Sequence, residues 1–183
     1  MAGHVRGLER SFAAKPAVDR QLDRASAPAR CRRQKGGPDH AIGRSRGGLS
    51  TKIHAVVDQD GLPVRLLITP GQASDKAAFP TLLAGLPQAT IVVADRGYDS
   101  RAPIELVAAR GGTAHIPTQR RVKIQRSVEP GLYRKRNLVE RYFCNLKQFR
   151  RVATRFEKLA SNFLAAVALA SARMWLGAIE STP

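Results

Sequence analysis

A carboxylate, Asp95, directly follows an unbroken apolar run. Residues 90–94 read TIVVA, which is typical of a strand buried on both faces, and Gly97 lets the backbone turn sharply just beyond it. Reacting groups in open α/β sheets gather at the carboxyl ends of the strands, so Asp95 is a candidate catalytic acid. A helix cap or a turn aspartate would leave the same pattern, and position alone does not separate these interpretations.

A second candidate carboxylate, Glu140, shares a helix face with three polar or charged side chains. At about 100° per residue, Arg136, Glu140 and Lys147 fall within about 40° of one another, and Tyr133 lies close by. One face thus presents a hydroxyl, a guanidinium, a carboxylate and an ammonium group. An ordinary solvated face with an Arg136–Glu140 ion pair is the alternative.

Other reactive residue types lack partners at useful spacings. His54 and His115 lie on separate predicted strands without a second histidine or cysteine at metal-ligand spacing, so we expect them to be packed or exposed rather than ligands. Cys31 and Cys144 are far apart and favour a reducing cytoplasm over a disulfide framework. The sequence contains no phosphate-binding loop of the G-x-x-x-x-G-K-[ST] type.

The charge of the chain favours an anionic polymer as partner. Lysine and arginine number 31 against 14 acidic residues, a formal charge of +17. Residues 51–118 hold 6 charges of each sign, whereas residues 119–158 hold 13 basic and 3 acidic residues and residues 1–50 hold 11 and 4. A balanced centre between basic flanks predicts a core domain with elements facing nucleic acid; a ribosome-associated or merely solvated basic surface is the alternative.

The elements that position these residues follow an alternating order. Asp60-Gly61 between two strand-like runs predicts a hairpin, and Ser74 is a candidate cap for the helix that follows. We expect strands over 51–58, 64–69, 90–94 and 114–117, helices over 75–86, 100–110, 132–158 and 162–176, and a basic loop over 119–130. This order predicts a mixed sheet with helices on both sides. The apolar stretch 163–170 is too short to span a bilayer and is interpreted as part of a core helix.

Four separated blocks, in order, resemble the DDE transposases of bacterial insertion sequences, of the insertion-sequence-five type. They are KGGPDHAIGRSRGGLSTKIHAVVD (35–58), LLITPGQASD (66–75), VVADRGYDS (92–100) and the spacing Tyr133-x2-Arg136-x3-Glu140-x6-Lys147. The closing segment SNFLAAVALASARMWL is also similar to the last helix of that family.

The resemblance implies an α/β fold, a ribonuclease-H-like mixed sheet flanked by helices. It implies Asp95 and Glu140 as two of three acidic metal ligands for Mg²⁺ (or Mn²⁺), with Tyr133, Arg136 and Lys147 contacting DNA. The implied partner is double-stranded DNA, at transposon ends and target, in the bacterial cytoplasm at the nucleoid. A homodimer stays open, and no membrane is implied.

The chain departs from the family at its N-terminus, where the first catalytic aspartate belongs. Asp19 falls at about the expected distance, but Arg20-Gln21 replace the usual neighbours and the usual histidines are missing. We therefore expect residues 1–34 to form an irregular basic segment, disordered or translated out of frame, and residues 35–180 to form the catalytic domain. The predicted function is metal-dependent DNA strand cleavage and transfer by a transposase, with this chain itself inactive. The alternatives are a non-catalytic DNA-binding remnant and an RNA-associated basic protein.

Overall fold

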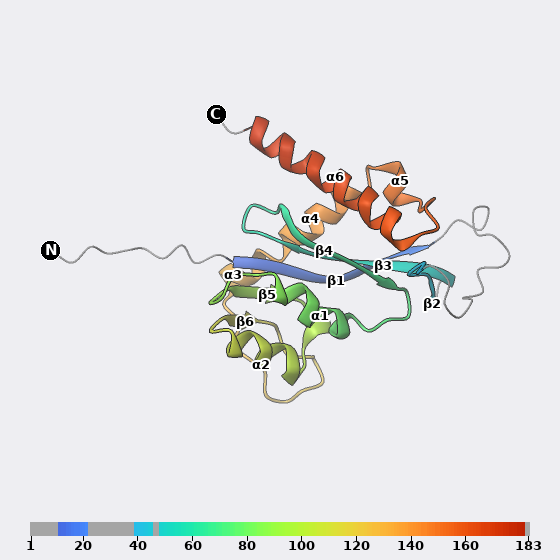
Figure 1. The fold of residues 1–183 in the computed structure, drawn as a ribbon. Helices are drawn as coiled ribbons and strands as arrows, with labels where there is room; N and C mark the ends of the chain where they lie inside the picture. Colours follow the sequence, from blue (N-terminus) through green and yellow to red (C-terminus); the bar gives the residue numbers. More distant parts are fainter. Residues whose placement is uncertain (1–10, 22–38, 46–47, 182–183) are drawn as a thin grey trace.

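A mixed sheet between two layers of helices forms the body of the protein. The computed structural model describes residues 11–21, 39–45 and 48–181, the first of these ranges as a backbone strand. The sheet has six strands in the order β2-β3-β1-β5-β6, and β4 also pairs with β3. Helices α1 and α2 cover one face, and α4 and α6 cover the other (Figure 1). The predicted mixed sheet with helices on both sides is confirmed.

The elements follow one another without a second domain in the part of the chain that the structure describes. They are β1 (Ser11–Gln21), β2 (Gly43–Ser45), β3 (Gly48–Val57), β4 (Pro63–Pro70), α1 (Asp75–Ala84), β5 (Ile91–Ala94), the 3-10 helix η1 (Arg96–Tyr98), α2 (Arg101–Ala109), β6 (Thr113–His115), α3 (Pro130–Arg134), α4 (Asn137–Leu146), α5 (Arg150–Ala153) and α6 (Ala160–Glu180).

The central hairpin and the buried strand form where the sequence predicts them. β3 and β4 pair antiparallel, and the turn between them has Gly61 at φ +83°. The Asp58 carboxylate accepts the backbone N–H groups of Asp60 and Leu62, which closes the turn. β5 pairs in parallel with β1 on one side and with β6 on the other. Its carboxyl end therefore lies in the interior of the sheet, between two neighbouring strands.

The prediction of an irregular segment over residues 1–34 is wrong for residues 11–21. They form β1, which pairs antiparallel with β3 and parallel with β5 in the middle of the sheet. The apolar strands β3 and β5 each need a partner for their backbone groups, and this demand outweighs the weak strand propensity of an alanine-rich segment. Pro16, which lacks an N–H, lies where the β1–β3 register shifts, a position that tolerates proline. The rest of residues 1–34 lies outside the described residues.

The predicted single helix over residues 132–158 is also wrong, because the structure divides it into α3, α4 and α5. Lys135 and Arg136 stay right-handed, and Arg136 N–H donates to the Tyr133 carbonyl in a tightened turn. Phe149 and Thr154 have extended backbones, and each of them interrupts the helix. These breaks let Phe149 pack against the apolar core and let Arg155 enter the interior.

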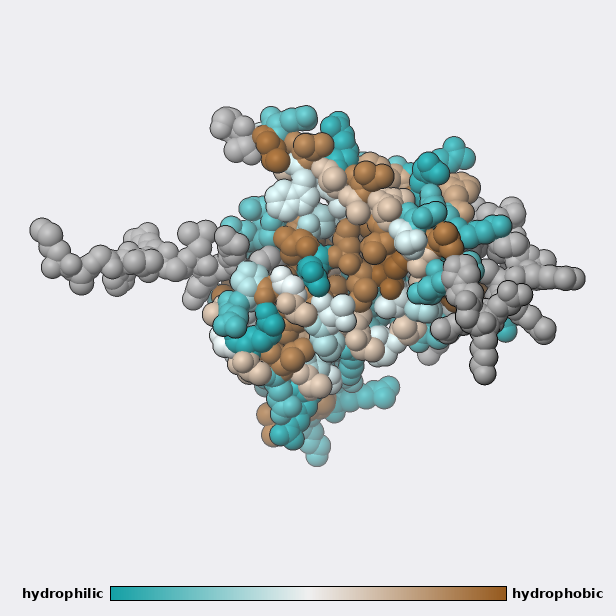
Figure 2. All heavy atoms as spheres, viewed as in Figure 1, coloured by the Kyte–Doolittle hydropathy of each residue, from teal (hydrophilic) through white to brown (hydrophobic). Residues whose placement is uncertain are grey.

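Two apolar cores lie on opposite faces of the sheet. β3 alternates between them, with Val56 in the core under α1 and α2, and with Ile53 and Val57 in the core under α4 and α6. α6 is long and apolar enough to cross a membrane by length and composition alone, but it packs Phe163 and other side chains into the second core. Figure 2 shows apolar side chains gathered between α6 and α1, and hydrophilic ones toward α2.

His54 on β3 is fully buried and behaves as a packed side chain rather than a ligand. Its Nε2 shares a 2.8 Å hydrogen bond with Thr69 Oγ1, as the sequence prediction of a packed histidine requires. Burial lowers the pKa of His54 below 6.5, and Lys52 lowers it further against the opposing effect of Asp75. The folded protein therefore holds this imidazole neutral.

Acidification is expected to destabilise the fold through His54. Below about pH 6.5 the unfolded chain takes up a proton that the folded chain refuses, so the unfolding free energy falls by up to about 1.4 kcal/mol per pH unit until the folded pKa is reached. Urea titrations between pH 7.5 and 5 should show this loss, and His54→Gln should remove it. His115→Gln is the control and should keep it. An identical pH dependence in His54→Gln would disprove the assignment.

Candidate active site

Asp95 lies at the carboxyl end of β5, as the sequence predicts, and begins a short, firmly anchored turn. Its Oδ1 accepts the Gly97 N–H at 2.7 Å, so the carboxylate also caps η1. Tyr98, in the same turn, is fully buried and packs its ring 5.3 Å from that of Phe79. Burial raises the pKa of the Tyr98 hydroxyl, and Asp75 and Asp95 raise it further. The turn therefore holds Asp95 half-buried in one orientation.

Glu140, Arg136 and Tyr133 form a contact row on one side of the α3–α4 segment. Arg136 Nη1 lies 2.6 Å from Glu140 Oε1, and the Arg136 guanidinium carbon lies 5.8 Å from the centroid of the Tyr133 ring. The opposite side of α4 buries Val139, Tyr142, Phe143 and Leu146 in the core. The contact row thus lies at the protein surface, and Arg136 orients Glu140.

Lys147 is exposed at the C-terminal cap of α4, two turns beyond Glu140. Seven residues of helix correspond to roughly 10 Å along the axis, so the lysine extends the same side of the helix toward solvent. The predicted helix face is present, but Lys147 stands apart from Arg136 and the two side chains that Arg136 contacts.

The two candidate carboxylates flank the same strand. Asp95 follows β5, which pairs with β1, and Glu140 lies on α4, which packs against β1 and β3. Topology therefore brings both acids to the neighbourhood of β1, which is where a third acid would have to stand.

Asp19 is not level with Asp95 along that strand. Ala14 pairs with Ala94, so the register places Lys15 level with Asp95 and Asp19 four residues farther on. The β1–β3 register shifts between Lys15 and Val18, so these four steps along β1 face only three steps along β3, which is roughly 10 Å. Asp19 instead pairs with Lys52 of β3. The residues that the structure describes contain no group of three acidic, histidine or cysteine side chains suited to a metal ion.

Arg155 is a structural residue that its sequence context conceals. It lies in the basic stretch after α5, yet its side chain is 1% exposed. It donates to the carbonyls of His40, Glu157 and Lys158 and to Thr51 Oγ1, and it lies 4.7 Å from the Phe163 ring. A basic run gives no signal that one of its arginines points inward.

Asp99 is a second residue that the sequence pattern did not single out. Its side chain is 8% exposed and pairs with Arg126 at 2.7 Å. Burial alone would raise the pKa of Asp99, but hydrogen bonds from Gln119 and Arg126 and the charges of Arg126 and Lys76 lower it overall. The sequence signal for Asp99 is its position four residues after Asp95, just beyond η1.

Known proteins resemble this chain across most of its length. The family model described as the transposase DDE domain matches residues 17–175. A transposase assigned to the insertion sequence element IS6501 of Brucella ovis is 39% identical over 132 residues, which cover 70% of this chain and 99% of that protein. A transposase assigned to IS402 of Burkholderia cepacia is 31% identical over 139 residues, 70% of this chain and 62% of that protein. With Asp95 at the carboxyl end of β5 and Glu140 on α4, the chain belongs to the DDE transposases of bacterial insertion sequences.

Proposed function

We propose that the chain is a ribonuclease-H-like catalytic domain of the insertion-sequence-five type, whose reaction is metal-dependent DNA strand cleavage and transfer at transposon ends. The observation that carries this proposal is the placement of Asp95 and Glu140 on two elements that flank β1. Acids from separate elements around one strand can hold ions while leaving room for a phosphate. The domain then includes β1, in place of a boundary at residue 35.

The chemistry of the donor set suits Mg²⁺ or Mn²⁺. Both candidate ligands are carboxylates, whose hard oxygens these ions prefer. Gly97 N–H donates to Asp95 and Arg136 donates to Glu140, and such hydrogen bonds typically orient metal-binding carboxylates. When bound, divalent ions activate the attacking oxygen and stabilise the leaving oxygen in phosphoryl transfer.

Double-stranded DNA is the proposed partner, at transposon ends and at the target, in the bacterial cytoplasm. The surface that begins at the contact row would meet the phosphate backbone near the transposon end through Arg136 and Lys147, with Tyr133 beside them. The charge of +17 favours such contacts. A homodimer would be compatible with this arrangement.

We further propose that the chain is catalytically silent as it stands. A site for two metal ions needs a third carboxylate near Asp95, and the residue that follows the Ala14–Ala94 pair on β1 is Lys15 rather than Asp19. A lysine at that position supplies no carboxylate oxygen to a divalent ion. The chain would then act as a non-catalytic DNA-binding remnant of a transposase, which is the second candidate function.

A strand-transfer assay with the full chain, a transposon-end duplex and Mg²⁺ or Mn²⁺ tests this proposal. The wild-type chain should bind the duplex but yield no product, and Asp19→Ala should not differ from it. Robust turnover that disappears in Asp19→Ala would show a complete acidic triad and overturn the claim of silence. Failure to bind duplex DNA would overturn the transposase proposal itself.

A further inference from the structure

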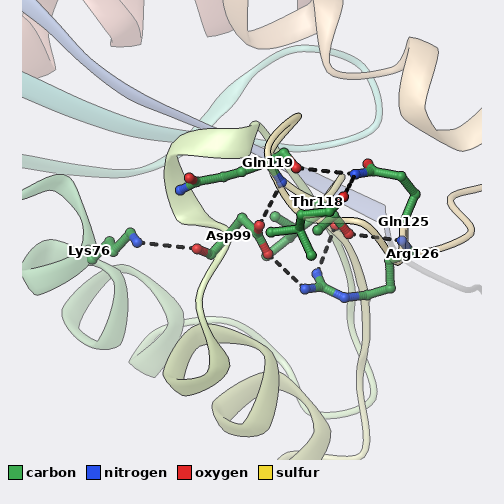
Figure 3. Close-up of polar contacts among 8 residues, drawn as sticks. Lys76, Asp99, Thr118, Gln119, Gln125 and Arg126 are labelled. Atoms are coloured by element: carbon green, nitrogen blue, oxygen red, sulfur yellow. Dashed lines mark hydrogen bonds and ion pairs between the residues drawn. The ribbon is translucent and has the colours of Figure 1, made fainter.

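A buried carboxylate fixes the basic loop that joins β6 to α3. Asp99 Oδ2 accepts the Gln119 N–H at 2.7 Å, and Oδ1 accepts a hydrogen bond from Arg126 Nη2 at 2.7 Å (Figure 3). These two contacts lie at opposite ends of residues 119–126, so one side chain clamps both ends of the loop. The Asp99 carbonyl in turn accepts from Lys76 Nζ at 3.2 Å, which ties the clamp to α1.

Polar contacts alone order this loop. Arg126 donates its N–H to Thr118 Oγ1 and its Nη1 to the Ile116 carbonyl, and Gln125 Nε2 donates to the carbonyls of Gln119 and Val122. The apolar side chains of the loop contribute little packing to its order, because Ile124 is 85% exposed and Val122 is 46% exposed. Loss of the Asp99 carboxylate would therefore release the loop without opening the core.

The tip of the clamped loop is a concentrated positive surface. Arg120, Arg121 and Lys123 are all exposed, and residues 119–128 contain no acidic residue. The same short turn η1 is capped by Asp95 at its start and by Asp99 at its end. The loop is thus attached to the turn that carries the candidate metal ligand, on the side of the molecule where α2 lies (Figure 1).

We propose that Asp99 is a positioning residue that holds residues 119–126 as a DNA-binding arm beside Asp95, with Arg120, Arg121 and Lys123 contacting the phosphates of duplex DNA. This inference rests on the proposed function and adds to it a second phosphate-binding surface besides the contact row on α4. A clamped loop presents its three charges without the entropic cost of ordering them on binding, which is why an acid can strengthen the binding of a polyanion.

The direction in which one substitution changes the affinity for DNA tests the proposal. Asp99→Asn removes a negative charge, so simple electrostatics predicts tighter DNA binding, whereas loss of the clamp predicts weaker binding. The full chain without metal is titrated with transposon-end duplex from 50 to 300 mM salt. We expect Asp99→Asn to weaken binding severalfold and to reduce the slope of log K against log salt. Replacing Arg120, Arg121 and Lys123 together by alanine should reduce that slope by about 2 to 3.

Glu105→Gln is the matched control, because it removes an equal charge from an exposed pair on the neighbouring helix α2. It should leave binding unchanged or slightly tighter. In the Asp99→Asn background, the three alanine substitutions should weaken DNA binding less than they do in the wild type. Trypsin should cut the loop of Asp99→Asn faster than that of the wild type. The melting temperature of Asp99→Asn should stay near that of the wild type. Wild-type DNA binding with an unchanged slope in the triple variant, or tighter binding by Asp99→Asn, would overturn the arm. A wild-type chain that binds no duplex would instead overturn the proposed function.

Discussion

Lys15→Asp is expected to give the silent chain a metal-dependent DNA-nicking activity, at least about 10²-fold above that of the wild type. The gain follows from the β1 register, in which Ala14 pairs with Ala94, one residue before Lys15 on β1 and one residue before Asp95 after β5. The substitution would complete a set of three carboxylates around β1. Metal-ion stabilisation of several kcal/mol corresponds to two or more powers of ten in rate.

The control for this prediction is Lys15→Asn, which removes the positive charge without supplying a carboxylate. Both variants are assayed for nicking of a supercoiled plasmid and of a transposon-end duplex with Mg²⁺ and with Mn²⁺, and both are checked for folding by thermal melting. A folded Lys15→Asp variant that is no more active than Lys15→Asn would show that the missing acid does not belong at this position.

Arg155→Met is expected to produce the largest loss of stability among single substitutions outside the apolar cores. The methionine would remove the hydrogen bonds that Arg155 donates to the His40 and Glu157 carbonyls and to Thr51 Oγ1, whereas the Lys158 carbonyl keeps its contact with His40 Nδ1. A hydrogen bond to a charged group contributes about 1.5–3 kcal/mol, so the loss of several of them should lower the free energy of unfolding by at least about 3 kcal/mol. That loss corresponds to a decrease of roughly 6–12 °C in melting temperature for a chain of this size.

Arg151→Met is the matched control in the same basic stretch. The Arg151 side chain is 79% exposed and pairs with Glu157 at 3.4 Å, and exposed pairs of this kind contribute about 0–1 kcal/mol. Urea denaturation of the two variants compares the same chemical change inside and outside the protein. Equal stability of the two would show that the buried arginine contributes nothing to folding.

Local patterning was sufficient to predict most of the fold from the sequence. The Asp-Gly turn predicted the β3–β4 hairpin, and the unbroken run TIVVA predicted β5, because both signals lie within a few residues of the elements that they specify. β1 was missed because its strand conformation comes from the unpaired edges of β3 and β5 rather than from its own residues. A strand that forms because distant strands need a pairing partner shows no alternating pattern of its own.

The candidate site was predictable to the same extent. The helical spacing predicted a shared face for Tyr133, Arg136 and Glu140, and in the structure Arg136 contacts both of the others. It did not reveal the breaks after α4, because these serve to bury Phe149 and Arg155, and burial of a charged residue cannot be inferred from a uniformly basic run. Asp99 escaped notice because its partners lie 20 and 27 residues farther along the chain.

The measurement that tests the central claim most directly is a Mn²⁺ titration, followed by electron paramagnetic resonance, of the full chain and of Asp95→Asn, Glu140→Gln and the double variant. If both carboxylates share one ion, each single variant should weaken Mn²⁺ binding at least about tenfold, and the double variant should lose less than the sum of the two effects. Additive losses, or a single variant that binds Mn²⁺ like the wild type, would show that Asp95 and Glu140 do not form one metal site.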